Sequence, residues 1–111
     1  KQGTGSLTVS HYGNIQRIPH RDILYIRHIS RYCEIAIKAG ETIQDDRGIK
    51  KLFEIIGDGR FIFIDRGALI NLDYLQKIEN GQAVMTNGHS LPISRRLLPQ
   101  VKLTINRYYG G

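Results

Sequence analysis

One stretch of the sequence decides the fold: residues 61–71 read Phe61-Ile62-Phe63-Ile64-Asp65-Arg66-Gly67-Ala68-Leu69-Ile70-Asn71. The first four side chains are all apolar, so this strand should be buried on both faces and should lie between two layers. A second apolar run resumes at residues 67–70. Asp65 and Arg66 interrupt the two runs, so the backbone must turn or bulge there. Such a turn would push the Arg66 guanidinium out of the layers.

Short β-favouring runs flank this stretch on both sides. Before it they occupy residues 7–10, 14–18, 23–29, 32–38 and 41–44, and after it residues 74–79, 83–86 and 90–93. Asn80-Gly81 and Asn87-Gly88 separate the last three runs, and these dipeptides are a strong hairpin signal. The sequence therefore predicts a mainly β fold of about ten short strands.

Two short helices are expected beside the strands. Residues 46–57 carry apolar side chains at helical spacing, with Asp46 suited to the N-cap and Gly57 to the C-terminal stop. A final helix is expected over residues 95–108, capped by Ser94. Pro99 falls inside that pattern and should kink or restart the helix near its first turn.

Length and charge restrict the possible functions. The chain has 111 residues, enough for one domain with a core and too few for two. Sixteen Lys and Arg against ten Asp and Glu leave a net charge of +6, which points to an anionic partner. No apolar run approaches the roughly 18 residues of a membrane span, and no signal sequence opens the chain. A cytoplasmic location without membrane contact is expected.

Catalytic and metal-binding patterns are weak. Cys33 is the single cysteine, which suits a reducing compartment, and no nucleophile signature surrounds it. It shares one face of an alternating strand with apolar neighbours, where cysteine is usually a small core residue. The histidines lack the paired spacing of a zinc site; they are His11, His20, His28 and His89. We predict no enzymatic activity, no metal and no cofactor.

Several basic residues fall in predicted loops or at strand ends, where a long side chain can reach a polyanion. They are Arg27, Arg31, Arg66, Arg95 and Arg96. Taken one at a time, each could be an ordinary solvated charge. Asp65 could equally form a surface ion pair with Arg66, which would explain nothing about function. The combined pattern favours binding of a polyanion.

Three stretches of the chain resemble the LytTR DNA-binding domain of bacterial transcription regulators. The first is Asp22-Ile23-Leu24-Tyr25-Ile26 followed by Tyr32, the second is residues 61–71, and the third is Asn87-Gly88 with Leu91-Pro92-Ile93-Ser94-Arg95-Arg96. The resemblance covers nearly the whole chain, from about Leu7 to Ile105. It implies an elongated fold of stacked sheets whose exposed loops enter successive major grooves of DNA.

The resemblance also assigns candidate DNA-binding residues. Base reading would fall on Arg66, on Arg95 and, in the first loop, on Cys33 or its neighbours Arg31 and Tyr32. Gly67, Ser94 and Arg96 would touch the DNA backbone. Arginine suits base reading because its guanidinium forks onto guanine O6 and N7.

Two of these positions depart from the family pattern. Asp65 stands where the family often has His, and it would either orient Arg66 or accept a hydrogen bond from a cytosine amino group. Cys33 is a poor hydrogen bonder, so it would offer apolar contact to a thymine methyl group. A redox role for Cys33 is a further hypothesis.

The composition of the chain ends predicts domain boundaries, and the family resemblance predicts partners. Residues 1–6 are expected to be a linker from a missing N-terminal region, residues 7–108 the DNA-binding domain and residues 109–111 a tail. The family implies an upstream receiver domain and dimers on direct repeats in double-stranded DNA. The alternative is a non-catalytic protein-interaction module of the same fold, whose basic face meets an acidic partner.

Overall fold

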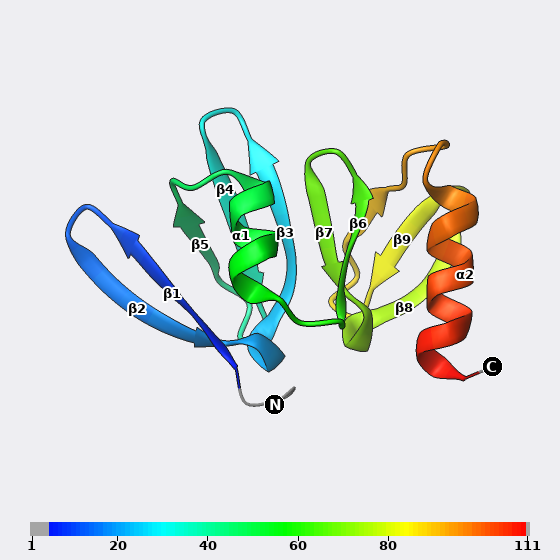
Figure 1. Ribbon diagram of the computed structural model, residues 1–111, viewed down its shortest axis with the longest axis horizontal. Helices are drawn as coiled ribbons and strands as arrows, with labels where there is room; N and C mark the ends of the chain where they lie inside the picture. The colour runs from blue at the N-terminus through cyan, green and yellow to red at the C-terminus, as the bar shows by residue number, and fades with distance from the viewer. Residues whose placement is uncertain (1–4, 111) are drawn as a thin grey trace.

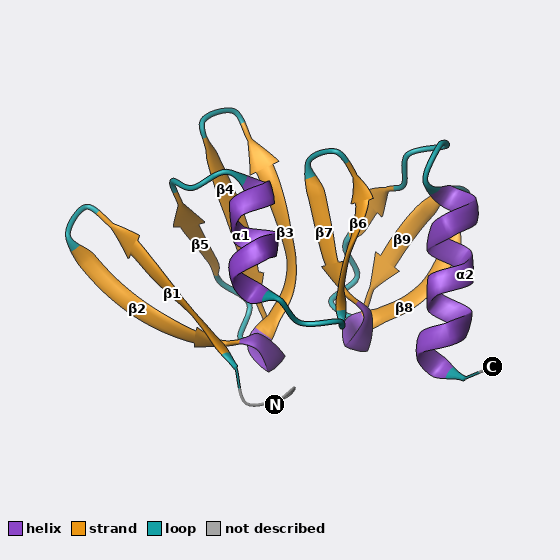
Figure 2. Cartoon of the chain, in the orientation of Figure 1, coloured by secondary structure: helices purple, strands orange, loops and turns teal. Residues whose placement is uncertain are grey.

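The computed structural model describes residues 5–110, most of which lie in ten strands and two helices (Figures 1 and 2). The strands are β1 (Ser6–His11), β2 (Asn14–Pro19), β3 (Ile23–Ile29), β4 (Tyr32–Ile37), β5 (Thr42–Asp45), β6 (Phe61–Asp65), β7 (Ala68–Asn71), β8 (Leu75–Glu79), β9 (Gln82–Met85) and β10 (Ser90–Pro92). The helices are α1 (Ile49–Ile56) and α2 (Leu98–Tyr109), and single 3₁₀ turns lie at His20–Asp22 and Leu72–Tyr74. The predicted mainly β fold is confirmed.

The strands form three antiparallel sheets. A five-stranded central sheet has the order β5-β4-β3-β7-β6, with the β1-β2 hairpin on one side of it and the sheet β10-β9-β8 on the other (Figure 1). The molecule measures 42 × 32 × 24 Å, and its three sheets follow one another along the longest axis. No helix within residues 5–110 has the length and apolar character to cross a membrane.

The central sheet is buried on both faces, as the apolar stretch at residues 61–64 predicts. In β6, Phe61 packs into a core covered by the β1-β2 hairpin and α1, whereas Ile64 packs into a second core covered by α2 and the sheet β10-β9-β8. In β7, Leu69 joins the first core and Ile70 the second. Both cores therefore depend on the β6-β7 hairpin.

Helix α1 begins two residues later than the sequence predicts. Gly48 is its N-cap, and no side chain caps the helix. The predicted cap, Asp46, instead lies 3.3 Å from Nδ1 of His11, a contact to a distant residue that a local pattern does not reveal. Gly57 ends the helix in the left-handed conformation with φ 50°, as predicted.

Helix α2 is also shifted toward the C-terminus. It starts at Leu98 after the N-cap Leu97, with Pro99 in its first turn, so the predicted restart near Pro99 is confirmed. The Ser94 side chain does not cap it, which corrects that prediction. The helix extends to Tyr109, into the expected tail, whereas residue 111 lies outside the described residues.

The N-terminal boundary also differs by one residue. Strand β1 takes in Ser6, the last residue of the expected linker, while residues 1–4 lie outside the described part of the chain. The predicted hairpin at Asn80-Gly81 is confirmed between β8 and β9, and the positive φ of both residues, 54° and 74°, makes it a type I′ turn.

Buried polar residues tie the segments together at the edge where the 3₁₀ turns lie (Figure 2). Asp58 accepts a hydrogen bond from Nδ1 of buried His20 at 3.2 Å and binds Nε of Arg60 at 3.1 Å. Burial by itself raises the pKa of Asp58, but hydrogen bonds from the Arg60 backbone and side chain and from His20 outweigh it and hold that pKa below its ordinary value. Asp58 therefore stays ionised in the folded protein near neutral pH.

Replacing Asp58 with Asn tests the contribution of this cluster to stability. Losing one partner of a buried ion pair costs about 3 to 5 kcal/mol, so Asp58→Asn should lower the free energy of unfolding at pH 7 by about 3 kcal/mol, measured by urea denaturation. Because the folded-state pKa is lowered, this stabilisation is present above about pH 4 and is lost as the pH falls through the folded-state value. The difference between wild type and variant should therefore shrink in acid.

The matched control is Glu41→Gln, which neutralises an exposed carboxylate. It should change the free energy of unfolding by less than about 0.5 kcal/mol. An Asp58→Asn variant as stable as the wild type at pH 7 would show that the ion pair contributes no net stability.

Candidate nucleic-acid interface

The first predicted loop is the tight turn between β3 and β4. Ser30 and Arg31 make the connection, and Ser30 has a left-handed backbone with φ 56°. The strand register closes with Ile29 opposite Tyr32. Arg31 is exposed and Tyr32 is half-buried, so the turn presents a guanidinium with an aromatic ring at its base.

The second loop is the turn between β6 and β7. The register of the two strands shifts between Phe63 and Asp65, as expected from the polar interruption, and Arg66 stands exposed at the turn. Asp65 Oδ2 accepts a long hydrogen bond from the backbone N–H of Gly67 at 3.4 Å. The Asp65 carboxylate therefore faces the turn backbone, and it forms no ion pair with Arg66.

The third loop joins β10 to α2. The backbone N–H of Ser94 donates to the carbonyl of Ile64 in β6 at 2.8 Å. The Ser94 carbonyl in turn accepts from the N–H groups of Leu97 and Leu98, both at 3.0 Å, which closes a turn. Arg95 and Arg96 lie exposed within this turn, ahead of the helix rather than in its first turn.

Strand pairing brings the three loops to one edge of the molecule. They lie along the upper edge in Figure 1, parallel to the longest axis. Strand β3 pairs with β7, and the N–H of His28 donates to the Gly67 carbonyl at 2.8 Å, so the first and second loops are held together. The Ser94–Ile64 bond holds the third loop to the second. We call this edge the loop edge.

The arginines of the loop edge carry no counter-charge within the protein. Across residues 5–110, seven exposed arginines have no carboxylate within ion-pair distance. Four of them gather on the loop edge, namely Arg31, Arg66, Arg95 and Arg96, and the other three, Arg17, Arg21 and Arg107, lie elsewhere. Three other arginines are neutralised by carboxylates: Arg27 by Glu34 at 2.7 Å, Arg47 by Asp45 at 2.6 Å and Arg60 by Asp58 at 3.1 Å. The guanidinium N–H groups of the loop edge are therefore free to donate hydrogen bonds to an external anion.

Comparison with known proteins identifies the family to which the chain belongs. The sequence pattern of the LytTr DNA-binding domain matches residues 13–106. The chain belongs to the LytTR family. Its fold is also similar to that of a solved LytTr DNA-binding domain from Bacillus cereus, described as part of a methyl-accepting/DNA response regulator. That match has a TM-score of 0.78 at 14% identity and covers 93% of this chain and 98% of the other. A search of curated protein sequences finds no match.

Cys33 is the LytTR candidate residue that the structure removes from the surface. Its side chain is 0% exposed and packs in the core beside α1, so it cannot offer a contact to a thymine methyl group in this conformation. Burial, together with the nearby Asp45 carboxylate, raises the pKa of the thiol. Both effects suppress thiolate formation, so neither a nucleophilic nor a redox role is supported. The alternating pattern of the strand had already indicated an inward side chain.

His28 and Lys50 join the LytTR loop edge without a sequence signal that singles them out. With Arg66 and Gly67 they line a shallow depression of about 370 Å³ next to the start of α1. A Cβ atom on Gly67 would lie 3.3 Å from the Cβ of His28, so glycine allows the two strands to approach closely here. Only the pairing of β3 with β7 and the placement of α1 bring these residues together. Within residues 5–110, no cluster of His, Cys, Asp or Glu side chains could hold a metal ion.

The burial of Cys33 predicts slow thiol chemistry in the folded protein. We expect Cys33 to react with Ellman's reagent at least about a hundredfold more slowly in native buffer than in denaturing urea, because reaction requires opening of the core. The absorbance of released thionitrobenzoate measures both rates. Equal rates would place the thiol at the surface and return Cys33 to the candidate interface.

Proposed function

We propose that this LytTR domain binds double-stranded DNA sequence-specifically, as the non-catalytic output domain of a bacterial transcription regulator. The observation that carries the proposal is the set of four exposed, unneutralised arginines on three loops of one edge. Counterion release at such an edge provides affinity, and guanidinium contacts to base edges provide specificity.

The dimensions of the molecule support contact with two successive major grooves. The longest dimension is 42 Å, and the loop edge runs along it (Figure 1). One turn of B-DNA rises by about 34 Å. An edge of this length can therefore follow one face of the duplex over about one helical turn.

Individual roles follow from the exposure of each residue. Arg66 and Arg95 are assigned to base reading, and the first loop contributes through Arg31 and Tyr32 now that Cys33 is buried. Gly67, Ser94 and Arg96 are assigned to the DNA backbone, with His28 and Lys50 beside them. Asp65 sits at the base of the Arg66 turn, where its carboxylate could accept from a cytosine amino group.

The biological setting is an extension of the same proposal. The similar Bacillus cereus domain is described as part of a response regulator. By analogy, the domain acts in the cytoplasm behind a receiver domain and binds direct repeats as a dimer.

Alanine substitutions test the division of roles. A binding site is first selected from a random duplex pool, and affinity is then measured by gel shift on that site and on unrelated DNA. Loss of a bidentate base contact costs about 1 to 3 kcal/mol, so Arg66→Ala and Arg95→Ala should each weaken the selected site roughly tenfold more than unrelated DNA. Arg96→Ala should weaken both DNAs to a similar extent.

Arg107→Ala is the matched control, because Arg107 is an exposed arginine on α2 away from the three loops. It should leave the ratio between selected and unrelated DNA unchanged. Equal losses on both DNAs for Arg66→Ala, Arg95→Ala and Arg96→Ala would contradict the assignment of base reading.

Salt dependence tests the electrostatic part of the proposal. If about four or five phosphates are neutralised, a plot of log affinity against log salt concentration should have a slope of roughly −4. Arg96→Ala should make the slope shallower by about one. Fluorescence anisotropy with labelled duplex between about 50 and 200 mM salt measures both slopes. A slope near zero would exclude a phosphate-based interface.

A further inference from the structure

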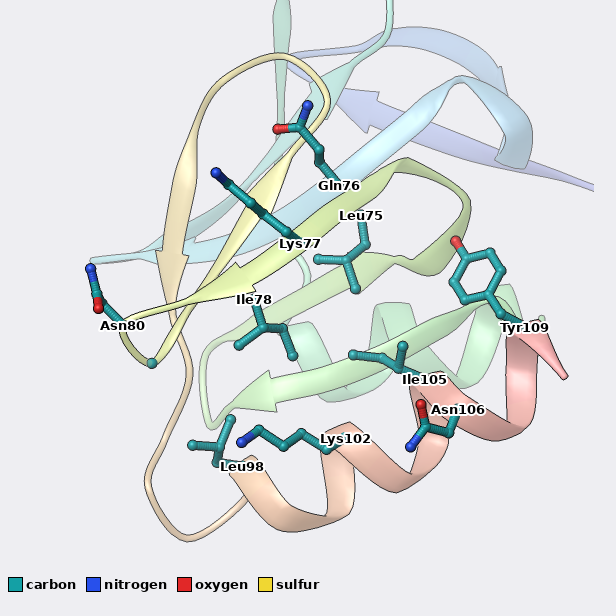
Figure 3. Close-up of a pocket in the computed structure, with 11 residues that line it drawn as sticks. Leu75, Gln76, Lys77, Ile78, Asn80, Leu98, Lys102, Ile105, Asn106 and Tyr109 are labelled. Atoms are coloured by element: carbon teal, nitrogen blue, oxygen red, sulfur yellow. The ribbon is translucent and has the colours of Figure 1, made fainter. Parts of the chain in front are cut away.

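A groove separates α2 from strand β8 at the end of the molecule (Figure 3). Its volume is about 660 Å³, within the usual range for binding sites. Leu75 and Ile78 of β8 form one wall, and Leu98 and Ile105 of α2 form the other. The four side chains point into the space between the two elements (Figure 3). The facing walls of the groove are thus apolar at these four positions.

Helix α2 is attached to the rest of the protein at one buried residue and at its C-terminal end. Val101 is the buried residue of the helix and packs into the second core. At the C-terminal end, the Tyr109 hydroxyl donates to the Leu72 carbonyl, and the Tyr108 hydroxyl donates to Asp73 Oδ1 at 2.7 Å. Burial and the hydrogen bond to Asp73 raise the pKa of Tyr108 to about 12, so its hydroxyl stays protonated and able to donate into the alkaline range. These contacts anchor α2 beside the groove.

The charged residues at the groove are Lys77 and Lys102, and no Asp or Glu among the described residues lines it. The Lys77 side chain points away from α2, whereas Lys102 lies along the helix near Leu98 (Figure 3). Lys77 forms an exposed ion pair with Glu79 at 3.0 Å, a contact that contributes about 0 to 1 kcal/mol in general and is easily exchanged. Lys102 has no carboxylate partner among the described residues. The groove therefore combines apolar side chains on both walls with one cation, Lys102, that is unpaired within residues 5–110 (Figure 3).

We propose that this groove binds an acidic amphipathic helix of a partner protein. Leucine-like side chains of that helix would enter between Ile78 and Ile105, and its carboxylates would meet Lys102. The groove follows α2 from Leu98 to Tyr109. Twelve helical residues span about 18 Å, which matches three turns of a docked helix. A DNA strand is a poorer fit, because a phosphate backbone gains nothing from apolar walls.

The test uses a designed peptide and no DNA, so its result is independent of the proposed DNA binding. The probe is a fluorescein-labelled peptide of about 15 residues, with leucines on one helical face and glutamates elsewhere. One control peptide has the same composition with the leucines scattered around the helix, and another carries lysine in place of glutamate. Fluorescence anisotropy should show the probe binding at least about tenfold more tightly than either control.

Two charge reversals locate the binding site. Lys102→Glu, at an exposed groove residue, should weaken the probe about tenfold, because it sets like charges against each other. The matched control Lys51→Glu, at an exposed residue of α1, should change affinity less than twofold. Asn106→Trp is a second groove variant, which fills the space without changing charge and should also weaken binding.

Three outcomes would overturn the proposal. The probe could bind no more tightly than the scattered-leucine peptide, or Lys51→Glu could weaken it as much as Lys102→Glu does. Sedimentation could instead show that two copies of this chain associate and that Lys102→Glu dissociates them without any peptide binding. That last result would assign the groove to a second copy.

Discussion

Burial of the β6-β7 hairpin on both of its faces is the constraint on which the loop edge depends. Phe61 and Leu69 contribute to one core, while Ile64 and Ile70 contribute to the other. A slip of one residue in either strand would exchange the two faces and disrupt both cores at once, so the register is strongly fixed. The turn at Arg66 is fixed with it, because the turn begins where the buried strand ends.

The β6-β7 hairpin also holds the neighbouring loops in place, since β7 pairs with β3 and the Ile64 carbonyl accepts a hydrogen bond from the N–H of Ser94. Three loops that are distant in sequence therefore share one rigid support.

Rigid support lowers the entropy cost of binding an anion, because the loops that carry the arginines of the loop edge are already ordered. A long side chain on a mobile loop loses loop entropy as well as rotamer entropy when it binds, whereas a tight two-residue turn has already lost the first. The arginines of the protein also differ in whether a carboxylate binds them. Arg47 and Arg60 are held by Asp45 and Asp58, which are among the few buried carboxylates, so these guanidinium groups belong to the fold. The exposed arginines of the loop edge have no such partner, and their combined positive potential attracts a polyanion.

Local patterns in the sequence predicted the strands and the turns well, because alternation and turn residues act over a few positions. The stretch from Phe61 to Ile64 even indicated two layers, since a strand that is apolar on both faces requires a cover on each side. The two helix-capping predictions were wrong because each residue forms a contact with a residue distant in the sequence. Asp46 reaches His11 instead of capping α1, and Ser94 contributes its backbone to β6 instead of its hydroxyl to α2. For Cys33 the alternation indicated burial while the family resemblance indicated DNA contact, and the structure supports the alternation.

The loop edge and the groove beside α2 meet in one short segment, yet they do not compete for the same side chains. Arg95 lies in the third loop, and Leu98, three positions later, begins α2 and lines one end of the groove. The backbone bond between Ser94 and Ile64 fixes the segment upstream, and the buried Val101 fixes it downstream. Because both ends are anchored, the segment can present cations to a polyanion on one side and apolar surface to a protein on the other. If the loop edge binds DNA and the groove binds a protein helix, the two partners contact different side chains of this segment. A regulator requires such a separation if it is to contact a second protein while it stays on its site.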